Sequence, residues 1–320
     1  MIYSVIAPQG WKMDLVGIES PSKAFETMSD FAIEAEKLGY DTVWLFDHFH
    51  TVPKPSQETT FECWTSTAAL ARDTHKIKIG QMVTCNNYRN PSLLAKMAST
   101  VDVMSKGRLR FGLGAGWYQQ EYEAYGYDFA KTPVRLKQLH EALEIIIQMW
   151  TTNEANYDGV FYRVKGAINQ PKGIQKPHIP IMVGGGGEKV TLKLVAKYAQ
   201  ASNLGFMDPQ TIKRKLYILD QHCQNVGTDY RHILKTVLLN CSIDNDENKA
   251  NARAKNDPNF ARNAGGEEYI TERSLIGTPR QIKQRIKEYE EAGIQEMIIY
   301  FPQDNRNESL RLFRDQIIHS

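Results

Sequence analysis

The chain has 320 residues, a formal net charge of +2 and 42% hydrophobic residues. This balance, without a basic stripe, argues against nucleic acid or a membrane surface as a partner, and no apolar stretch approaches the length of a membrane span. The four cysteines are widely separated and form no CxxC pair, so we expect reduced thiols in a cytoplasmic enzyme.

Short apolar runs of β type alternate with longer segments of helical period along the whole chain, which is the pattern of a parallel α/β sheet. The predicted strands are Tyr3–Pro8, Thr42–Phe46, Ile77–Thr84, Leu109–Ala115, Ile179–Val183, Ala201–Gly205, Lys235–Ile243 and Glu296–Phe301. The predicted helices are Ser22–Leu38, Phe61–Arg72, Ser92–Ser105, Val134–Trp150, Lys189–Gln200, Gln210–Val226, Pro279–Ala292 and Asn307–Ile318. Several of them begin with an N-cap acceptor followed by proline, at Asn90-Pro91, Thr132-Pro133, Asp208-Pro209 and Thr278-Pro279.

Two segments interrupt the alternation. Tyr157–Val164, with Asp158-Gly159 at its turn, predicts a β-hairpin before the fifth strand. The polar segment Asp244–Gly277 predicts a helix followed by a mobile excursion. Eight strand–helix units favour a single (β/α)₈ TIM barrel over residues 1–320, with insertions in the βα loops at about 156–178 and 244–277. A doubly wound sheet is the competing architecture, but it would not need the last strand to close a ring.

Polar residues at the carboxyl ends of the barrel strands become the candidate site, because barrel active sites lie there. After the second strand, Asp47 is followed by His48, which could act as acid, base or cofactor contact, or belong to a hydrogen-bonded loop. His48 and His50 also form an HxH pair that could bind a metal. The other histidines do not fall at strand ends, so we predict no metal ligands.

The third and fourth predicted strands end in residues that could border a heterocycle. Met82, Val83, Thr84 and Asn86 follow one another at the end of the third strand, where hydroxyl and amide groups suit the edge of a ring, although Asn-Asn is also a turn signal. The fourth strand ends in a glycine-rich run that includes Gly114 but does not have the dinucleotide-binding spacing. Small residues there would let a flat ring approach the backbone, with Trp117 and Tyr118 as walls.

The most specific local signal is the run of Gly184, Gly185, Gly186, Gly187 and Glu188 between the fifth strand and the next helix. Glycines allow successive N–H groups to point inward, and the helix that follows adds the positive end of its dipole. We therefore predict an anion cradle of the kind that holds phosphate in barrels. A merely flexible loop is the alternative.

The chain resembles the bacterial luciferase-like monooxygenases, a family of flavin-dependent and F420-dependent enzymes. The matching runs, spread over nearly the whole chain, are Gly39–Trp44 through His48, Glu62–Thr65, Ala68–Ala71, Arg89–Pro91, Leu94–Lys96, Asp102–Arg108, Gly112–Trp117, Glu121, Gly126, the Gly184 loop and Gly277–Pro279.

The resemblance implies a TIM barrel that is usually dimeric, with the flavin or deazaflavin ring in its mouth and the phosphate near the Gly184 loop. It also implies a bulge with a non-prolyl cis peptide at Met82-Val83 as a backstop for the ring. His48 falls where the family places an active-site histidine, and Asp47 precedes it as a ring contact. The related sugar-phosphate dehydrogenases have an acidic residue at the position of Trp117, which argues against that reaction here.

The favoured hypothesis is a two-component monooxygenase that uses reduced FMN and O₂ on an unknown organic substrate, with a separate flavin reductase as partner. His48 would then be the acid, base or stabilising group beside the ring. The predicted substrate pocket is lined by Trp11, Phe49, Trp117 and Tyr118. The close alternative is hydride transfer with coenzyme F420 at the same ring and phosphate sites. Alternatives of other classes are a metal-dependent barrel hydrolase using Asp47, His48 and His50, and a non-enzymatic flavin-binding protein.

Overall fold

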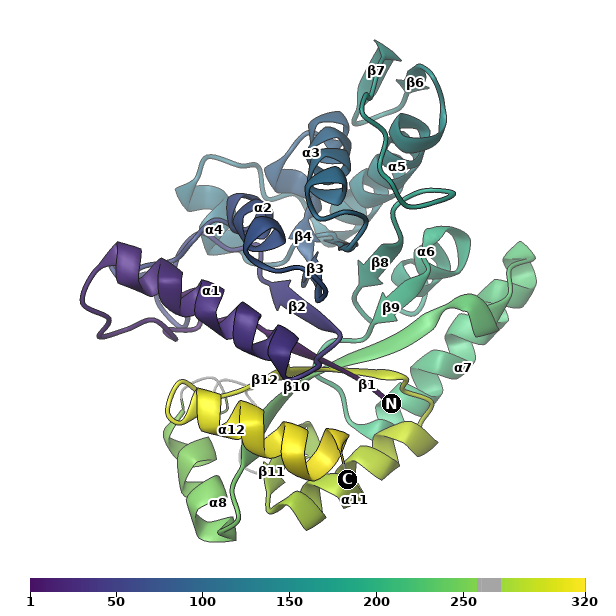
Figure 1. The fold of residues 1–320 in the computed structure, drawn as a ribbon. Coiled ribbons are helices and arrows are strands. Elements are labelled where there is room, and N and C mark those ends of the chain that lie inside the picture. Colours follow the sequence, from purple (N-terminus) through teal and green to yellow (C-terminus); the bar gives the residue numbers. More distant parts are fainter. Residues whose placement is uncertain (258–259, 261–271, 320) are drawn as a thin grey trace.

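Parallel strands surrounded by helices form the body of the protein in a computed structural model that describes residues 1–257, 260 and 272–319 (Figure 1). The strands are β1 Ile2–Ile6, β2 Thr42–Leu45, β3 Lys78–Gln81, β4 Thr84–Cys85, β5 Leu109–Gly114, β6 Ala155–Asp158, β7 Arg163–Ala167, β8 Ile181–Gly184, β9 Ala201–Asn203, β10 Leu234–Ile243, β11 Ser274–Gly277 and β12 Glu296–Tyr300. Strands β10, β12, β1, β2, β3, β5, β8 and β9 pair in that order, and β9 pairs back with β10. This closed parallel ring confirms the predicted (β/α)₈ barrel.

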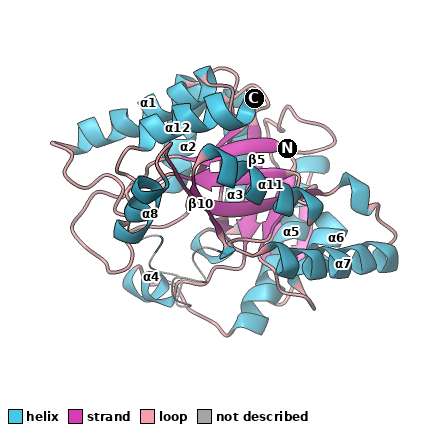
Figure 2. Ribbon diagram, turned by 90° about the horizontal axis from the view of Figure 1, so that it is seen from below, coloured by secondary structure: helices cyan, strands magenta, loops and turns pink. Residues whose placement is uncertain are grey.

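Helices cover the outside of the ring, as the view from below shows (Figure 2). They are α1 Pro21–Lys37, α2 Cys63–Asp73, α3 Pro91–Met104, α4 Gln119–Ala124, α5 Thr132–Thr151, α6 Thr191–Tyr198, α7 Pro209–Val226, α8 Glu247–Asn256, α11 Pro279–Glu291 and α12 Arg306–Phe313. Asn90 and Asp208 are N-caps as predicted. Thr132 is not, because α5 already begins at that residue. None of the helices in the described ranges is long and apolar enough to cross a membrane.

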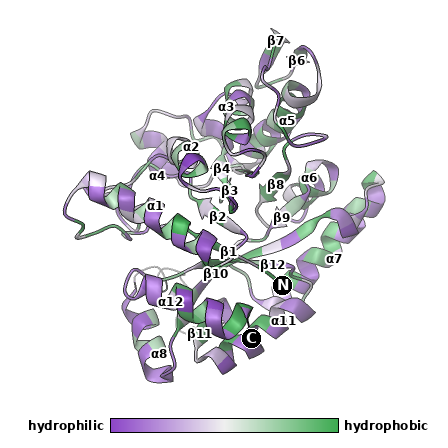
Figure 3. Cartoon of the chain, viewed as in Figure 1, coloured by the Kyte–Doolittle hydropathy of each residue, from purple (hydrophilic) through white to green (hydrophobic). Residues whose placement is uncertain are grey.

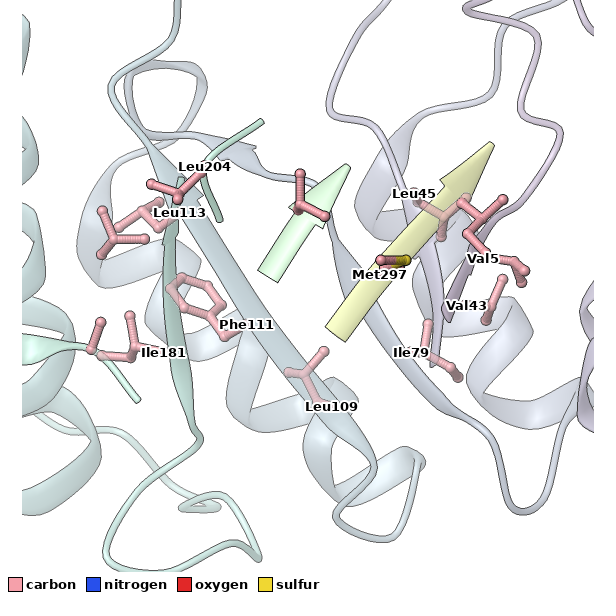
Figure 4. Packing of buried hydrophobic residues seen from close by; sticks show 14 of the residues in the cluster. Val5, Val43, Leu45, Ile79, Leu109, Phe111, Leu113, Ile181, Leu204 and Met297 are labelled. Atoms are coloured by element: carbon pink, nitrogen blue, oxygen red, sulfur yellow. The ribbon is translucent and has the colours of Figure 1, made fainter. Parts of the chain in front are cut away.

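Alternation along the strands separates two hydrophobic layers, since successive side chains of a strand point to opposite faces. Val43 and Leu45 of β2 face the helices, in the layer that also holds Phe111 of β5 (Figure 4). Trp44 and Phe46 point instead into the barrel. The outer helices, such as α1 and α7, carry hydrophilic and hydrophobic residues in alternation, as expected for helices with one face on the barrel (Figure 3).

The amino-terminal end of the barrel holds a part-buried ion pair. Arg110 donates to Glu296 Oε1 at 2.8 Å, and Ser4 Oγ donates to the same oxygen at 2.6 Å. The Arg110 guanidinium also lies over the Trp44 ring, 4.8 Å from its centroid. All four cysteines are buried free thiols. A cavity of about 230 Å³ remains at this end of the barrel, and Ile2, Arg110 and Met182 are among the residues that line it.

One further strand, β11, was not predicted. It lies at the end of the segment expected to be a helix followed by an excursion; the helix is present as α8, whereas most of the excursion falls outside the described residues. Asn240 to Ile243, the carboxyl half of β10, pair with Ser274 to Gly277. The amino-terminal end of β10 pairs with β9 instead. A strand of four residues is too short to show a recognisable hydrophobic alternation in the sequence. It is identified only by its pairing with the long strand β10.

The predicted hairpin is present as β6 and β7, and its loop is fastened by Glu141 of α5. The carboxylate accepts the N–H groups of Val160, Phe161 and Tyr162 at 2.9, 2.9 and 3.1 Å. Glu141 itself is buried. This carboxylate therefore takes the place of the backbone partners that the loop lacks.

Replacing Glu141 with alanine should leave three part-buried N–H groups without their acceptor, and we expect a loss of about 1–3 kcal/mol in the free energy of unfolding. Urea unfolding measures it. Glu154→Ala, an exposed carboxylate beside the same hairpin, is the matched control and should change stability by no more than about 0.5 kcal/mol. Equal effects of the two substitutions would show that the loop does not depend on Glu141.

Candidate active site

The carboxyl end of the barrel gathers side chains from several loops. The loops after β1 and β2 supply Trp11 and His48, and the loop between β5 and α4 supplies Trp117 and Tyr118. Parallel strands end at the same edge of the ring, so residues far apart in sequence meet there. Four of the predicted site residues therefore lie close together.

A buried pair joins His48 to Glu121 of α4. Nδ1 of His48 lies 2.7 Å from Oε2 of Glu121. The Phe49 N–H donates to Oε1 at 2.8 Å, and the Tyr88 hydroxyl donates to Oε2 at 2.9 Å. When the carboxylate is ionised, Nδ1 of His48 must donate in this hydrogen bond. In the neutral ring, Nε2 is then the nitrogen that can accept a proton.

Glu121 is suited to stay ionised. Burial alone would raise its pKa, but the hydrogen bond and charge of His48, the Phe49 N–H and the Tyr88 hydroxyl lower it further, so the pKa lies below its ordinary value. Glu121 was not predicted to have a role, although it belongs to one of the matching runs. The signal that could have found it is an acidic residue in the first turn of the short helix after a barrel strand.

The His48 ring is held between aromatic side chains. It stacks on Trp11 with centroids 4.0 Å apart and an interplanar angle of 7°. The rings of Trp117 and Tyr118 stand nearly perpendicular to it, with centroids 5.8 and 6.0 Å away. Three of the four residues predicted to line the substrate pocket thus surround His48, and its orientation is fixed by packing as well as by Glu121.

Phe49, the fourth, packs in a separate cluster. Its ring lies 4.6 Å from Tyr88 and 4.4 Å from Tyr125. The neighbouring His50 has Nδ1 3.3 Å from the Thr51 carbonyl oxygen. Among the described residues no three His, Cys, Asp or Glu side chains converge as metal ligands would. The arrangement therefore gives the metal-hydrolase alternative no support.

Asp47 belongs to a buried ion pair. Arg89 donates to both of its oxygens, at 2.7 and 2.9 Å, and the Cys85 N–H donates at 2.8 Å. Burial would lower the pKa of Arg89, but the charge and hydrogen bonds of Asp47 raise it above its ordinary value. We expected Asp47 to contact the cofactor ring. In the structure it links the end of β2 to β4 and to the segment just before α3.

The strand that was predicted as Ile77–Thr84 is divided into β3 and β4 by Met82 and Val83, whose peptide bond is cis as the resemblance implied. Met82 belongs to the interior cluster. Val83 lies against glycines of β5 and β8: a Cβ built on Gly114 would come within 2.8 Å of its side chain, and one on Gly184 within 2.9 Å. These two glycines therefore make room for Val83.

Thr84 and Asn86 follow this break, and Thr84 faces helix α2. Thr84 Oγ1 accepts from Trp64 Nε1 of α2 at 3.2 Å. Asn86 Nδ2 donates to the Tyr162 hydroxyl of the hairpin at 3.1 Å, while its buried Oδ1 has no partner among the described residues. Asn86 thus retains one acceptor, whereas the Thr84 hydroxyl already has a partner on the outside of the barrel.

The loop from Gly184 to Glu188 leads from β8 toward α6. Gly185 has φ +118° and donates its N–H to the Asn203 carbonyl. The N–H groups of the next residues, from Gly186 to Val190, have no hydrogen-bond partner in the described part of the chain. The Glu188 carboxylate points back to Lys215 at 2.9 Å and Arg214 at 3.1 Å. The backbone groups are thus available to an anion, and two cations stand beside them.

Lys12 was also missed. It is buried at the same end of the barrel, with Nζ 4.3 Å from the Tyr300 ring, 5.1 Å from Phe206 and 5.3 Å from Phe46. Aromatic faces attract a cation, which offsets part of the cost of burying the ammonium group. A lysine next to a tryptophan after the first strand gave no sequence signal for this.

Comparison with known proteins identifies the family of the chain. The family model of luciferase-like monooxygenases matches residues 7–296. An F420-dependent glucose-6-phosphate dehydrogenase of Amycolatopsis mediterranei is 23% identical, over 95% of this chain and 97% of the relative. A structure of an F420-dependent secondary alcohol dehydrogenase with an F420–acetone adduct superposes with a TM-score of 0.83 at 22% identity, covering 99% of each chain.

A second similar structure is the monooxygenase RslO1 of Streptomyces bottropensis, with a TM-score of 0.82 at 19% identity, covering 100% of this chain and 99% of the other. At these identities the structures show the common fold. The family follows from the match over most of the length. The chain is therefore an enzyme of the oxidoreductase type that belongs to the luciferase-like monooxygenase family.

Proposed function

We propose that the protein transfers a hydride between coenzyme F420 and the carbon of an alcohol or carbonyl substrate. The observation that carries the proposal is the His48–Glu121 pair at the carboxyl end of the barrel. Oxidation of an alcohol requires a group that takes the hydroxyl proton as the hydride leaves, and a histidine backed by a carboxylate is suited to this. The printed names of the relative and of one similar structure, both F420-dependent dehydrogenases, support the choice of cofactor.

The residues present fit such a cofactor. The unpartnered N–H groups from Gly186 to Val190 at the start of α6 would hold its phosphate. Met82 and Val83, which bend the third strand inward, would lie behind the ring. Asp47 and Thr84, both engaged elsewhere, would act on the ring only through the backbone that they hold.

When bound, oxidised F420 supplies the hydride acceptor. His48 Nε2 would accept the hydroxyl proton while the carbinol hydride leaves, so that the substrate loses two electrons and becomes a carbonyl compound. Glu121 would stabilise the imidazolium that forms, because its charge is held 2.7 Å from Nδ1. Stacking on Trp11 would hold the imidazole ring in one orientation. The reverse reaction uses the same groups in the opposite order.

The competing proposal is the one favoured by the sequence, reduced FMN with O₂ and a separate flavin reductase. A cytoplasmic homodimer remains our expectation in either case. The arrangement of His48 serves proton transfer in both reactions, so the cofactor must be decided by binding.

Anaerobic titration of the purified protein with F420 and with FMN, each in oxidised and reduced form, is expected to show F420 binding at least about tenfold more tightly. Tighter binding of reduced FMN, with O₂ consumed during substrate oxygenation, would contradict the proposal. Gly186→Asp places a negative charge in the cradle and should weaken F420 binding about tenfold or more. Binding of a deazaflavin without the phosphate should be unchanged by the same substitution, which makes it the matched control.

A further inference from the structure

Trp117 exposes a large apolar surface beside the candidate catalytic histidine. Trp117 is 63% exposed. One face rests on Tyr118, with ring centroids 5.1 Å apart and an interplanar angle of 26°. Large aromatic side chains usually gain from burial. An indole exposed to solvent at the end of the barrel is therefore suited to be covered by a bound molecule.

The position of Trp117 is set by buried groups. Gly116, which precedes it, has φ +73°, a conformation that favours glycine. A Cβ on Gly116 would lie 2.0 Å from the Tyr122 hydroxyl and 2.6 Å from Cys85 Sγ. Both of those side chains are buried, and they contact each other at 2.9 Å. The backbone is thus packed tightly just before the exposed indole, which fixes the direction from which Trp117 leaves the barrel.

The exposed indole is continuous with the His48 site. Its ring centroid lies 5.8 Å from that of His48, and the two planes are inclined by 73°. A flat group stacked on Trp117 would lie beside the His48 site. Stacked aromatic groups lie about 4.5–7 Å apart between centroids. A reacting carbon attached to such a group would therefore come within reach of His48.

We propose that Trp117 is a stacking subsite for the substrate, so that the substrate is an alcohol or carbonyl compound with a planar aromatic ring next to the reacting carbon. That the substrate is an alcohol or carbonyl compound rests on the proposed hydride transfer. The stacking subsite itself depends only on the geometry of Trp117, Tyr118 and His48. An indole face offers no acceptor or donor for a row of hydroxyl groups and much area for a flat apolar ring.

The first test is binding without cofactor. Calorimetric titration with 2-naphthylmethanol and with propan-2-ol should show that the wild-type protein binds the aromatic alcohol more tightly. Trp117→Ala should weaken binding of 2-naphthylmethanol by about tenfold or more, and Trp117→Phe should retain most of it. Tyr217→Ala removes an aromatic ring that is 67% exposed on α7, and it should leave binding unchanged. Equal binding by wild type and Trp117→Ala would overturn the subsite.

The second test is turnover with F420. The ratio of kcat/KM for 2-naphthylmethanol to that for propan-2-ol should fall about tenfold in Trp117→Ala and stay constant in Tyr217→Ala. Selective binding without any turnover would sink the proposed hydride transfer and leave the subsite standing. A change of oligomeric state in Trp117→Ala, seen by sedimentation, would mean that the indole packs on a second copy, and this would overturn the subsite.

Discussion

Replacing His48 with glutamine is expected to lower turnover with F420 by about 10²- to 10⁴-fold, the usual contribution of a positioned acid or base. Glutamine can still donate to Glu121 and fill much of the space beside Trp11, so the fold should be kept. It cannot take up a proton. Steady-state kinetics with an alcohol substrate measures the loss in kcat, and fluorescence titration should show F420 affinity within about threefold of wild type. A variant that keeps full turnover would exclude His48 as the proton acceptor.

Glu121→Gln keeps the shape of the partner and removes its charge. The loss in turnover should also be large, up to about 10⁴-fold, because a carboxamide neither stabilises the imidazolium nor holds the proton of the neutral ring on Nδ1. The pKa of Glu121 is held below its ordinary value. Its contribution to stability is therefore fully present above the unfolded value of about 4.3 and is lost as the pH falls through the lower folded pKa. The stability difference between wild type and Glu121→Gln should be constant above neutral pH and shrink only in acid.

Replacing Asp47 with alanine is expected to lower the free energy of unfolding by about 3–5 kcal/mol, the cost of leaving a buried charge without its partner. The Arg89 side chain is 10% exposed, and its other acidic contact is Glu62, whose carboxylate is 36% exposed. The Cys85 N–H would lose its acceptor as well. Urea unfolding measures the effect.

The double variant Asp47→Ala with Arg89→Met separates the two roles that Asp47 could have. If the ion pair explains the loss, the double variant should recover a large part of it, with a coupling energy of about 2–3 kcal/mol. If Asp47 is instead only a ring contact, as the resemblance implied, Asp47→Ala should keep its stability and lose cofactor affinity. Strictly additive losses from the two substitutions would argue against the ion pair as the cause.

The sequence by itself determined the barrel, because it depends on local periods. Apolar alternation in segments such as Thr42–Phe46 and helical spacing between them are visible without any long-range information. The hairpin and the glycine loop were also found locally, from a turn signal and from a run of one residue type. The resemblance added the break at Met82-Val83, which no period shows.

Tertiary structure decided which way the side chains at the mouth point. Simple alternation along the third strand would turn Thr84 inward, two positions after Met82. The break places both Met82 and Val83 inside, so that Thr84 points outward to Trp64. One displaced residue reverses the face of those that follow, because the side-chain period of a strand is two.

The active-site partners were decided in the same way. Glu121 lies 73 positions from His48 in the chain, and the two meet only because the loops after β2 and β5 lie at the same end of the ring. Asp47 pairs with Arg89 for a similar reason. The two residues are 42 positions apart in the chain, and the fold brings the buried carboxylate next to the guanidinium. Residue type and local spacing predict which groups can do chemistry at the barrel end. Which of them touch one another depends on contacts between distant segments, and these exist only once the ring has closed.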